Sequence, residues 1–451
     1  MLRIPYLPPE LYCAIFYHLE LWDRIRVSHV CSLWRVVALD DASLWSTLRF
    51  KQPKALPVEA LAELLRRTKE AAVSIGPLRV DNEARDFGRI LAEHMRHIDF
   101  LDILFNLPVS STELFAALKV AAPVLTSLNL RVHRSAASLP DDIFAHHAPL
   151  LRNITLDNIR IPSNCSALSR VTQAMISTPT HFATGTACLS DIMPLLTDII
   201  MTLRDWPAYT LNAPNNIDSI TLLPECDDDA LLAHLGLLHH ANVFHMVLAF
   251  ATVAAMRAVL ADLEGVITYL EVQYVPEGDE GGYITAEFRG EHGRMRRFTY
   301  VESSVFRTVI MENALCTLNL ETLECAQHLL YLFEGMPFPE LVNLHLLYHR
   351  ARNPNGEVEP SLPRALKWIL RDECTPNLHT LFLSADSAAD GTIVDVDSAA
   401  YVAALKRRPG TPKIRRLLIQ RVCLVGPSEE LNALTGGHEL FVDSEDEGSD
   451  D

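Results

Sequence analysis

Apolar positions near the start of the chain recur with the spacing of short helices. The first stripe repeats every three or four residues and forms one broad apolar helix face: Leu11, Tyr12, Ile15, Phe16 and Leu19. A second stripe keeps a helical spacing: Val27, Val30, Cys31, Trp34 and Ala38. Asp40 and Asp41 then offer caps for a last short turn. The pattern predicts three short helices between residues 8 and 48.

Further along, a second apolar pattern repeats. Its template, apolar-x-x-apolar-x-apolar, begins at ten positions: Ile98, Leu125, Leu151, Ile217, Val243, Ile267, Leu315, Leu341, Leu378 and Ile414. Five of the steps between neighbouring copies lie between 24 and 27 residues. Helical patterns lie outside these copies, at 58–67, 141–147, 227–240, 252–263, 363–370 and 399–407. A strand and a returning helix at this period predict parallel strands stacked into a curved sheet with outer helices. An ordinary α/β domain with a parallel sheet is the alternative.

The long gaps between copies differ in composition. Residues 157–216 include a small polar run and are expected to hold one weak repeat and a flexible loop. Residues 275–302 alternate glycine-rich turns with β-type runs, which predicts a hairpin inserted into or closing a repeat. Residues 351–362 and 386–397 have the composition of loops.

Charge and composition narrow the class of protein. The net charge is −18, and because the last nine residues hold six acids, about −12 remains on the body, which disfavours general nucleic-acid binding. The most apolar run, 246–256, is too short to span a bilayer, and we expect no secretory leader. Nine cysteines without a CxxC pair fit reduced thiols in the cytoplasm or nucleus.

Residues 7–48 read LPPELYCAIFYHLELWDRIRVSHVCSLWRVVALDDASLWSTL. This stretch resembles an F-box, the short helical module by which a protein docks onto the Skp-type adaptor of a cullin-based ubiquitin ligase. The resemblance rests on paired positions such as Leu7-Pro8, Ile15-Phe16 and Leu44-Trp45, at the family's spacing. It implies helix-in-groove docking on the adaptor by these residues: Leu7, Pro8, Leu11, Ile15, Phe16, Val30, Cys31, Trp34, Leu44 and Trp45. The last five of them divide between module core and interface.

The remainder resembles the leucine-rich-repeat domains that follow F-boxes, in a degenerate form whose asparagine-ladder position is mostly not filled. More narrowly, the chain resembles F-box proteins abundant in basidiomycete, mushroom-forming fungi. We therefore expect an α/β chain with a three-helix F-box at 4–50 and a helical linker at 51–96. An irregular leucine-rich-repeat-like solenoid, with parallel strands and outer helices, follows at 97–437, and a disordered acidic tail at 438–451.

Polar residues between the apolar strand positions are expected on the concave face of such a solenoid: Thr126, Ser127, Asn129, Arg152, Asn153, Thr155, Asp218, Ser219, Thr221, Asn343, His345, His379 and Thr380. Solvated strand faces have the same composition. We take seven of them as candidates for target contact: Asn129, Arg152, Asn153, Asp218, Asn343, His345 and His379.

A basic patch stands out in this acidic chain: Lys406, Arg407, Arg408, Lys413, Arg415 and Arg416. It is a nuclear-import address, a docking patch for phosphorylated cargo, or the basic end of a helix followed by a solvated loop. Ser444 and Ser449 precede acids and are candidate phosphosites in what is otherwise a solubilising tail. Signatures of hydrolases, nucleotide-binding folds and zinc proteases are lacking, so we expect no catalysis, cofactor or metal.

Together these features predict the substrate-recognition subunit of an SCF-type E3 ubiquitin ligase. The F-box would bind the Skp-type adaptor and, through it, a cullin scaffold, and the repeats would bind an unknown protein target. The alternative is a structural interaction protein that binds the Skp adaptor without delivering substrates to a ligase. A third possibility, an enzyme on an α/β body, needs a cleft with converging titratable groups.

Overall fold

The computed structural model describes residues 7–54, 56–80, 84–105, 114–133, 136–177, 187–204, 209–210, 217–238, 243–261, 263, 267–277, 281–290, 292–312, 319–348, 364–371, 373–385, 394–407, 414–435 and 438–440. The chain divides into two compact units, Met1–Asn242 and Val243–Asp451.

Four helical segments open the first unit, where three were predicted: α1 (Pro9–Tyr17), α2 (Leu21–Val27), α3 (Ser32–Asp40) and the 3-10 helix η1 (Ala42–Trp45). The second predicted stripe is wrong as one helix, because α2 ends at Val27 and α3 starts only after Cys31, whose sulfur accepts the Trp34 amide at 3.5 Å. The predicted cap before the last turn is present: Asp41 Oδ1 accepts the Ser43 amide at 2.9 Å.

Trp45 is the centre of this small helical module. Its side chain is fully buried, and its indole Nε1 donates to the Ala38 carbonyl at 2.7 Å. The Arg67 guanidinium lies over the ring at 4.6 Å, so the next helix along the chain closes the module. Buried Arg24 donates to the Leu19 carbonyl at 2.8 Å and to the Leu44 carbonyl. The Arg24 side chain thus connects the segment after α1 with η1 through its two hydrogen bonds.

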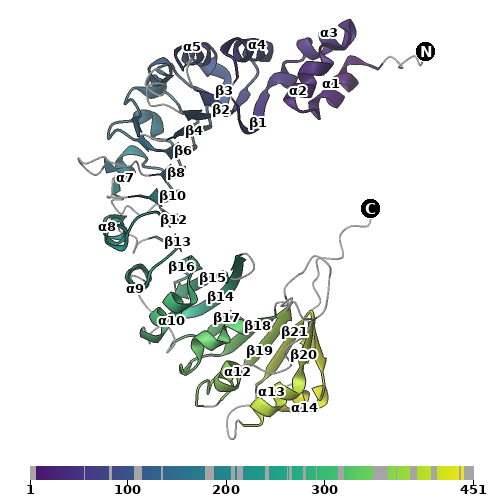
Figure 1. Ribbon diagram of the computed structural model, residues 1–451, viewed down its shortest axis with the longest axis vertical. Coiled ribbons are helices and arrows are strands. Elements are labelled where there is room, and N and C mark those ends of the chain that lie inside the picture. The colour runs from purple at the N-terminus through teal and green to yellow at the C-terminus, as the bar shows by residue number, and fades with distance from the viewer. Residues whose placement is uncertain are drawn as a thin grey trace. The chain divides into compact units, whose positions relative to one another are not determined.

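Eight parallel strands form the sheet of the first unit, each paired with the next: β1 (Thr47–Lys54), β2 (Val73–Val80), β3 (Ile98–Phe105), β4 (Ser127–Val132), β6 (Asn153–Asp157), β8 (Gln173–Ser177), β10 (Asp198–Leu203) and β12 (Ser219–Pro224). Helices cover one side of this sheet: α4 (Val58–Thr68), α5 (Ala84–His94), α7 (Leu189–Ile192) and α8 (Asp228–Leu238) (Figure 1). The returning segments also hold η2 (Met95–His97), β5 (Ala137–Ser138), η3 (Ile143–His146), β7 (Ile159–Arg160), η4 (Ser166–Leu168), β9 (Ala187–Cys188) and β11 (Tyr209–Thr210).

One carbonyl per repeat sets the register of these strands. Thr126 O accepts the amides of both Arg152 and Asn153, at 2.9 and 3.1 Å. The same two-donor arrangement recurs at the Arg152, Thr172 and Thr197 carbonyls. In the second unit it recurs at Glu321, Val342 and His379. These strands therefore start level with their neighbours, and within each unit their alternate side chains point to that unit's core.

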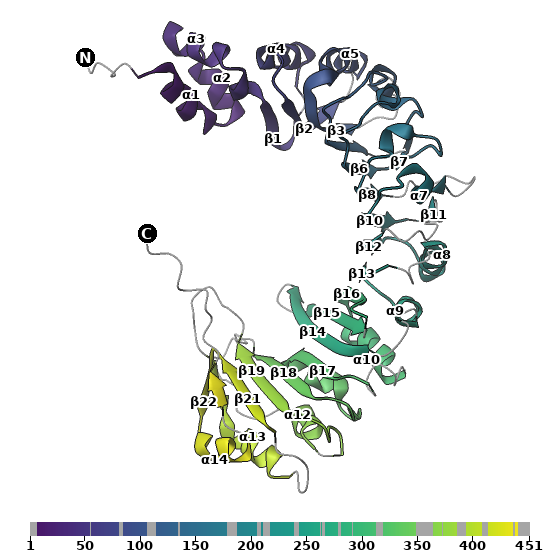
Figure 2. The ribbon, with the colours of Figure 1, turned by 180° about the vertical axis from the view of Figure 1, so that it is seen from behind.

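The second unit begins with β13 (His245–Ala249), which pairs in parallel with β16 (Met295–Val301). β16 and β14 (Ile267–Glu277) both run antiparallel to β15 (Gly281–Gly290), which confirms the predicted hairpin, and β14 is parallel to β17 (Thr322–Ala326). Figure 2 shows these antiparallel strands beside the parallel strands that follow, β18 (Asn343–Tyr348), β19 (Thr380–Ala385) and β21 (Arg416–Gln420). A last short strand, β23 (His438–Leu440), pairs in parallel with β21. The remaining elements are α9 (Val253–Ala261), α10 (Ser303–Glu312), η6 (Gln327–Phe333), α12 (Arg364–Ile369), the pair β20 (Val394–Asp397) and β22 (Val422–Val425), α13 (Ser398–Leu405) and α14 (Ser428–Leu434).

Several predicted boundaries are corrected by these strands. Residues 51–96 are not a helical linker, because β2 within them pairs with both β1 and β3. Residues 157–216 hold two sheet strands, β8 and β10, where one weak repeat was expected. The copy at Leu315 is out of register: the strand is β17, whose core side chains include Leu323 and Cys325, and Leu315 lies outside the described residues.

The predicted helices agree with the structure more closely than the predicted boundaries of the linker and strands do. Five of the six predicted helices are present, as α4, α8, α9, α12 and α13. The sixth, at 141–147, is only the 3-10 turn η3, in which Phe144 and Ala145 have left-handed backbone angles. The fold is therefore mixed α/β with N-terminal helices and a sheet rich in parallel strands. Across the described segments, no helix combines the length and hydropathy needed to span a membrane.

Leu130 tests the core of the first unit. It lies on β4 with 0% of its surface exposed, so Leu130→Ala should lower the free energy of unfolding by about 2–5 kcal/mol. Leu150→Ala is the matched control, because Leu150 is 47% exposed, and its loss should cost about 0.5 kcal/mol or less. Urea unfolding followed by circular dichroism measures both, and equal costs would contradict the core assignment.

A pair of histidines, His97 buried and His94 half-buried, predicts an effect of pH on the stability of the same unit. His97 Nε2 lies 3.3 Å from His94 Nδ1 and 3.4 Å from Thr68 Oγ1, with the exposed Glu70–Arg96 ion pair and Glu93 nearby. Burial lowers the pKa of both histidines below the ordinary 6.5, and the neighbouring imidazole lowers that of His97 further.

Because both pKa values are lower in the folded chain, the unfolded chain binds more protons at these two histidines as the pH falls below about 6.5. Stability from this pair is complete above about pH 6.5 and is lost as the pH falls through the lowered pKa values. We expect His94→Gln to flatten the fall of the urea midpoint between pH 7 and 5 relative to the unchanged chain. His133→Gln, at an exposed position, is the control and should leave that slope unaltered.

Candidate functional site

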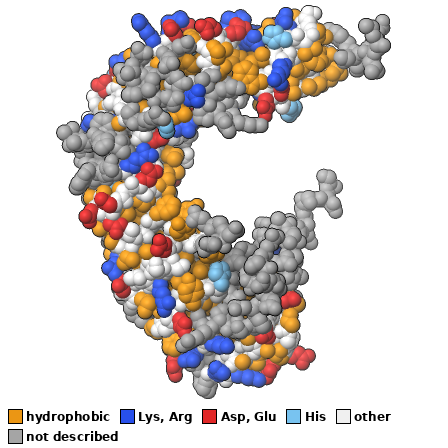
Figure 3. Space-filling view, in the orientation of Figure 1, with side chains coloured by type: hydrophobic (Ala, Val, Ile, Leu, Met, Phe, Trp, Pro, Cys, Tyr) orange, Lys and Arg blue, Asp and Glu red, His pale blue; other side chains and the backbone are white. Residues whose placement is uncertain are grey.

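The N-terminal helices expose an apolar face. On α1, Leu11 and Ile15 are 50% and 52% exposed, and Val30 after α2 is 62% exposed. Figure 3 shows hydrophobic side chains at the surface beside the N-terminal end of the described chain. Large aliphatic side chains grouped on a surface mark a site where another molecule covers them.

The opposite side of α1 packs inward. Tyr12 and Phe16 are buried, and the Trp34 ring lies against both, with centroid distances of 6.1 and 5.4 Å. The four-residue spacing explains the division, because residues 11 and 15 face one way and residues 12 and 16 face another. One helix thus contributes Tyr12 and Phe16 to the core of the module and Leu11 and Ile15 to its exposed apolar side, called the open side of α1 below.

The predicted adaptor-binding residues separate into three groups by exposure. Five are exposed: Pro8, Leu11, Ile15, Val30 and Cys31. Leu7 and Trp34 are half-buried. Phe16, Leu44 and Trp45 are buried at 0–1% exposure, so the structure places them in the module core and not on its surface. Three further large side chains on α1, α2 and α3 are exposed but were not among the predicted residues: Tyr17, Trp22 and Val36, at 57%, 38% and 57%.

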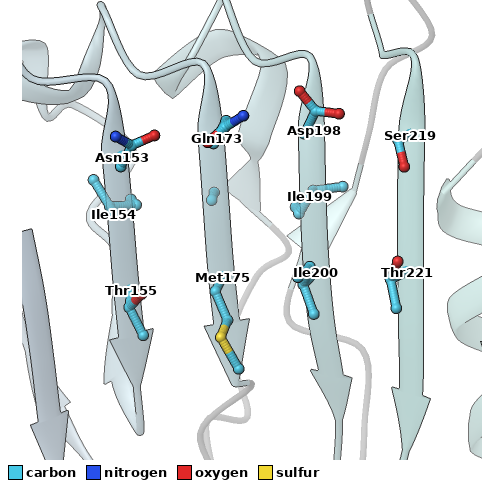
Figure 4. Close-up of a pocket in the computed structure, with 11 residues that line it drawn as sticks. Asn153, Ile154, Thr155, Gln173, Met175, Asp198, Ile199, Ile200, Ser219 and Thr221 are labelled. Carbon is cyan, nitrogen blue, oxygen red and sulfur yellow. The ribbon is translucent and has the colours of Figure 1, made fainter. Parts of the chain in front are cut away.

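A second candidate surface is the open face of the first unit's sheet. There a pocket of ≈ 380 Å³ lies over β6, β8, β10 and β12. Its side chains form two rows in register across the strands (Figure 4). The first row is polar: Asn153, Gln173, Asp198 and Ser219. The second is apolar at its centre: Thr155, Met175, Ile200 and Thr221.

Strand alternation builds this pocket. Ile154, Ile199 and Ile220 are 0–3% exposed and point into the core, so the residues on either side of each point out of the sheet. Met175 and Ile200 are 40% and 39% exposed in the middle of the second row. The arrangement offers an apolar floor bordered by hydrogen-bonding groups, which is the composition of a ligand or peptide site.

The predicted target-contact residues of this unit have different surroundings. Asn153 lines the pocket, and its Nδ2 donates to Ser127 Oγ at 3.2 Å. Asn129 stands on β4 in register with Thr155, and Asp218 is exposed at the start of β12. Arg152 instead caps the sheet, because its guanidinium donates to three carbonyls, those of Pro149, Leu151 and Arg170.

On the open face of the second unit, His345 joins three strands. Its Nδ1 lies 3.2 Å from Glu324 Oε1 on β17, and its Nε2 lies 2.6 Å from Ser384 Oγ on β19. The ring stacks on Phe382 at 4.1 Å. Burial acts to raise the pKa of Glu324, but the hydrogen bond and charge of His345 outweigh it and bring that pKa below its usual value.

A serine, histidine and glutamate connected in this way have the order of a hydrolase triad. Two features of Ser384 argue against that role. Ser384 is 3% exposed, and it lies within β19, paired with β18 on one side and β21 on the other, where backbone amides serve the sheet and not an oxyanion. We interpret the connection as the network that holds the predicted target-contact residue His345 in place.

The same face carries a row of paired charges. Glu287, 2% exposed, lies between Arg289 and Arg297, with a 2.6 Å contact to Arg289. Glu271 stands beside it in register, and burial together with the neighbouring carboxylates raises its pKa. The Tyr269 hydroxyl bridges Glu271 and Glu324 at 3.2 and 3.0 Å. Most of this face is therefore committed to internal hydrogen bonds and ion pairs.

The other predicted residues of the second unit lie at its strand starts and helix ends. Asn343 Nδ2 donates to Thr322 Oγ1 at 3.2 Å, and His379 is half-buried before β19. In the basic patch, Lys406 and Arg407 follow the end of α13, and Lys406 pairs with Glu430. Arg415 and Arg416 are exposed at the start of β21. Four predicted residues lie outside the described segments: Arg408, Lys413, Ser444 and Ser449.

Comparison with known families bears on the first surface. A family model described as F-box-like matches residues 4–51, the segment that contains α1, α2, α3 and η1. No curated protein matches the chain. The chain thus carries an F-box-like domain, the kind of domain that binds Skp-type adaptors. The leucine-rich-repeat and fungal resemblances of the body stay predictions. Within the described residues, no three potential ligands gather as a metal site.

Proposed function

We propose that this chain is the substrate-recognition subunit of an SCF-type ubiquitin ligase. The observation that carries the proposal is the open side of α1, where Leu11 and Ile15 stay half-exposed inside the segment matched by the F-box-like model. These side chains would enter an apolar groove of a Skp-type adaptor, in the helix-in-groove manner. Most of the binding energy would come from a few such anchors.

The body would hold the target. We interpret it as a degenerate leucine-rich-repeat solenoid, and the shared carbonyls at the strand starts, together with helices on one side of the first unit's sheet, support that interpretation. Such a body presents an open sheet face to a protein ligand. In this proposal the chain does no chemistry: tethering a target near the ubiquitin-conjugating enzyme raises the local concentration of its lysines.

A cytoplasmic or nuclear location belongs to the same proposal. Among the described residues, eight cysteines carry no disulfide. Reducing compartments keep thiols in that state.

The adaptor interface is tested by a double substitution on α1. Leu11→Glu with Ile15→Glu places two carboxylates in the apolar contact, and we expect co-purification of the Skp-type adaptor to fall at least about 100-fold. Both residues are half-exposed, so the urea midpoint should stay unchanged.

The matched control is Val120→Glu with Met311→Glu, because these two residues are 42% and 58% exposed outside the F-box-like segment. It should retain the adaptor. Full adaptor recovery with the α1 double variant would refute the assigned interface.

Ligase function is tested in cells with the proteasome blocked. We expect cullin to co-purify with the unchanged chain, and a set of proteins to gain ubiquitin relative to cells that express the Leu11→Glu, Ile15→Glu variant. Mass spectrometry of ubiquitin-remnant peptides measures the difference. Recovery of adaptor without cullin, and no protein gaining ubiquitin, would instead support the structural interaction protein.

A further inference from the structure

The pocket over β6, β8, β10 and β12 contains polar side-chain groups that make no internal hydrogen bond among the described residues. Asp198 Oδ2 accepts the Thr197 hydroxyl at 2.8 Å, and Asp198 Oδ1 has no partner among the described residues. Within the same described set, the side chains of Gln173, Ser219 and Thr221 make no hydrogen bond. A ligand can therefore bond to this row without breaking an internal contact.

Negative charge is concentrated at one side of the pocket, near β10 and β12. Asp198 is the one charged residue among those that line it. Asp218 is exposed directly before β12, and no cation pairs with either aspartate among the described residues. Two cations at the far ends of β4 and β10 are paired: Arg131 with Asp102 at 2.8 Å, and Arg204 with Glu225 at 2.7 Å. The side of the pocket at β10 and β12 is thus negative and complementary to a basic group.

Apolar side chains lie next to Asp198 on the same face of the sheet. Ile200 follows Asp198 by two residues, so the two side chains stand about 6.6–6.8 Å apart on one face. Met175 lies beside Ile200 in register on β8, and the two are 40% and 39% exposed. Side chains i and i+2 of an extended peptide have the same separation and also share a face.

We propose that this pocket captures an extended segment of a target protein in which Lys or Arg stands two residues before or after a large apolar residue. The basic side chain pairs with Asp198, and the apolar side chain covers Met175 and Ile200. This inference rests on the proposed function, because it specifies the target that the body would hold. Asn153 and Gln173 would bond to the peptide backbone beside the ion pair.

The probe is an immobilised array of peptides based on Gly-Thr-Lys-Thr-Leu-Thr-Gly and its reversed order. The Lys position is varied to Arg, Gln and Glu, and the Leu position to Phe and Ser. The full-length chain, purified with its Skp-type adaptor, is applied at low salt, because a partly exposed ion pair weakens as salt rises. We expect Lys and Arg peptides with Leu or Phe to retain about tenfold more protein than Glu or Ser peptides.

Charge reversal gives the decisive variant. Asp198→Lys should invert the preference, so that Glu peptides bind better than Lys peptides, and Asp198→Asn should remove the difference between Lys and Gln. Asp191→Lys on α7 is the matched control, because it makes the same charge change at an exposed position that does not line the pocket, and it should keep the original order.

The apolar half has its own pair of variants. Met175→Ser with Ile200→Ser should remove the preference for Leu over Ser while leaving Lys over Glu. Val120→Ser, at a residue of similar exposure, should change neither. Equal binding of Lys, Gln and Glu peptides, or no more effect from Asp198→Lys than from Asp191→Lys, would overturn the inference.

Two results separate this inference from the proposed function. If the array shows no preference while the adaptor co-purifies and cullin is recovered, the pocket assignment falls and the ligase proposal stands. If the adaptor never co-purifies with the unchanged chain, the ligase proposal falls, whatever the array shows. Preference for acidic peptides by the unchanged chain would also overturn the inference.

Discussion

One type of backbone hydrogen bond, repeated from strand to strand, determines which side chains lie next to each other on the open sheet faces. At seven positions in the described segments, the carbonyl before a strand accepts two amides from the next strand's start, as Thr126 O does from Arg152 and Asn153. Threonine hydroxyls reinforce it: Thr172 Oγ1 and Thr197 Oγ1 donate to carbonyls of the preceding repeat, at 3.4 and 3.1 Å. A slip of one residue would turn every core side chain outward, so burial of the leucines and isoleucines maintains this register.

The open sheet faces of the two units differ in which side chains the strand register brings together. In the second unit, opposite strands bring Glu271, Glu287 and Glu324 side by side, and arginines, a tyrosine and His345 neutralise or bond to them. In the first unit the corresponding rows contain amides, one aspartate and two large apolar residues whose polar neighbours are mostly uncommitted. Ligand binding costs least where no internal bond must break, which is why we assign target capture to the first unit.

The F-box-like module obeys a related constraint at smaller scale. Fewer than fifty residues cannot enclose every large apolar side chain that they carry. Trp45 and Phe16 take the interior, with Arg67 from α4 completing the enclosure, and Leu11 and Ile15 are left at the surface. The division follows from helix geometry, and it leaves apolar side chains at the surface where the proposed adaptor would cover them.

Local periodicity was enough to predict the helices α4, α8 and α9 and the strands around Leu130 and Leu346, because spacing along the chain decides which side a residue faces. The F-box-like segment was instead predicted from its resemblance to that family, which the family model matches over residues 4–51. The template also fits β10, since Leu196, Ile199 and Met201 have its spacing, but the three consecutive apolar residues at 199–201 obscured the alternation. The template failed at β8, where Ala174 fills a core position. Only the tertiary structure decided which rows meet: Asp198 beside Gln173, or His345 beside Ser384, depends on cross-strand register, which no pattern along one strand contains.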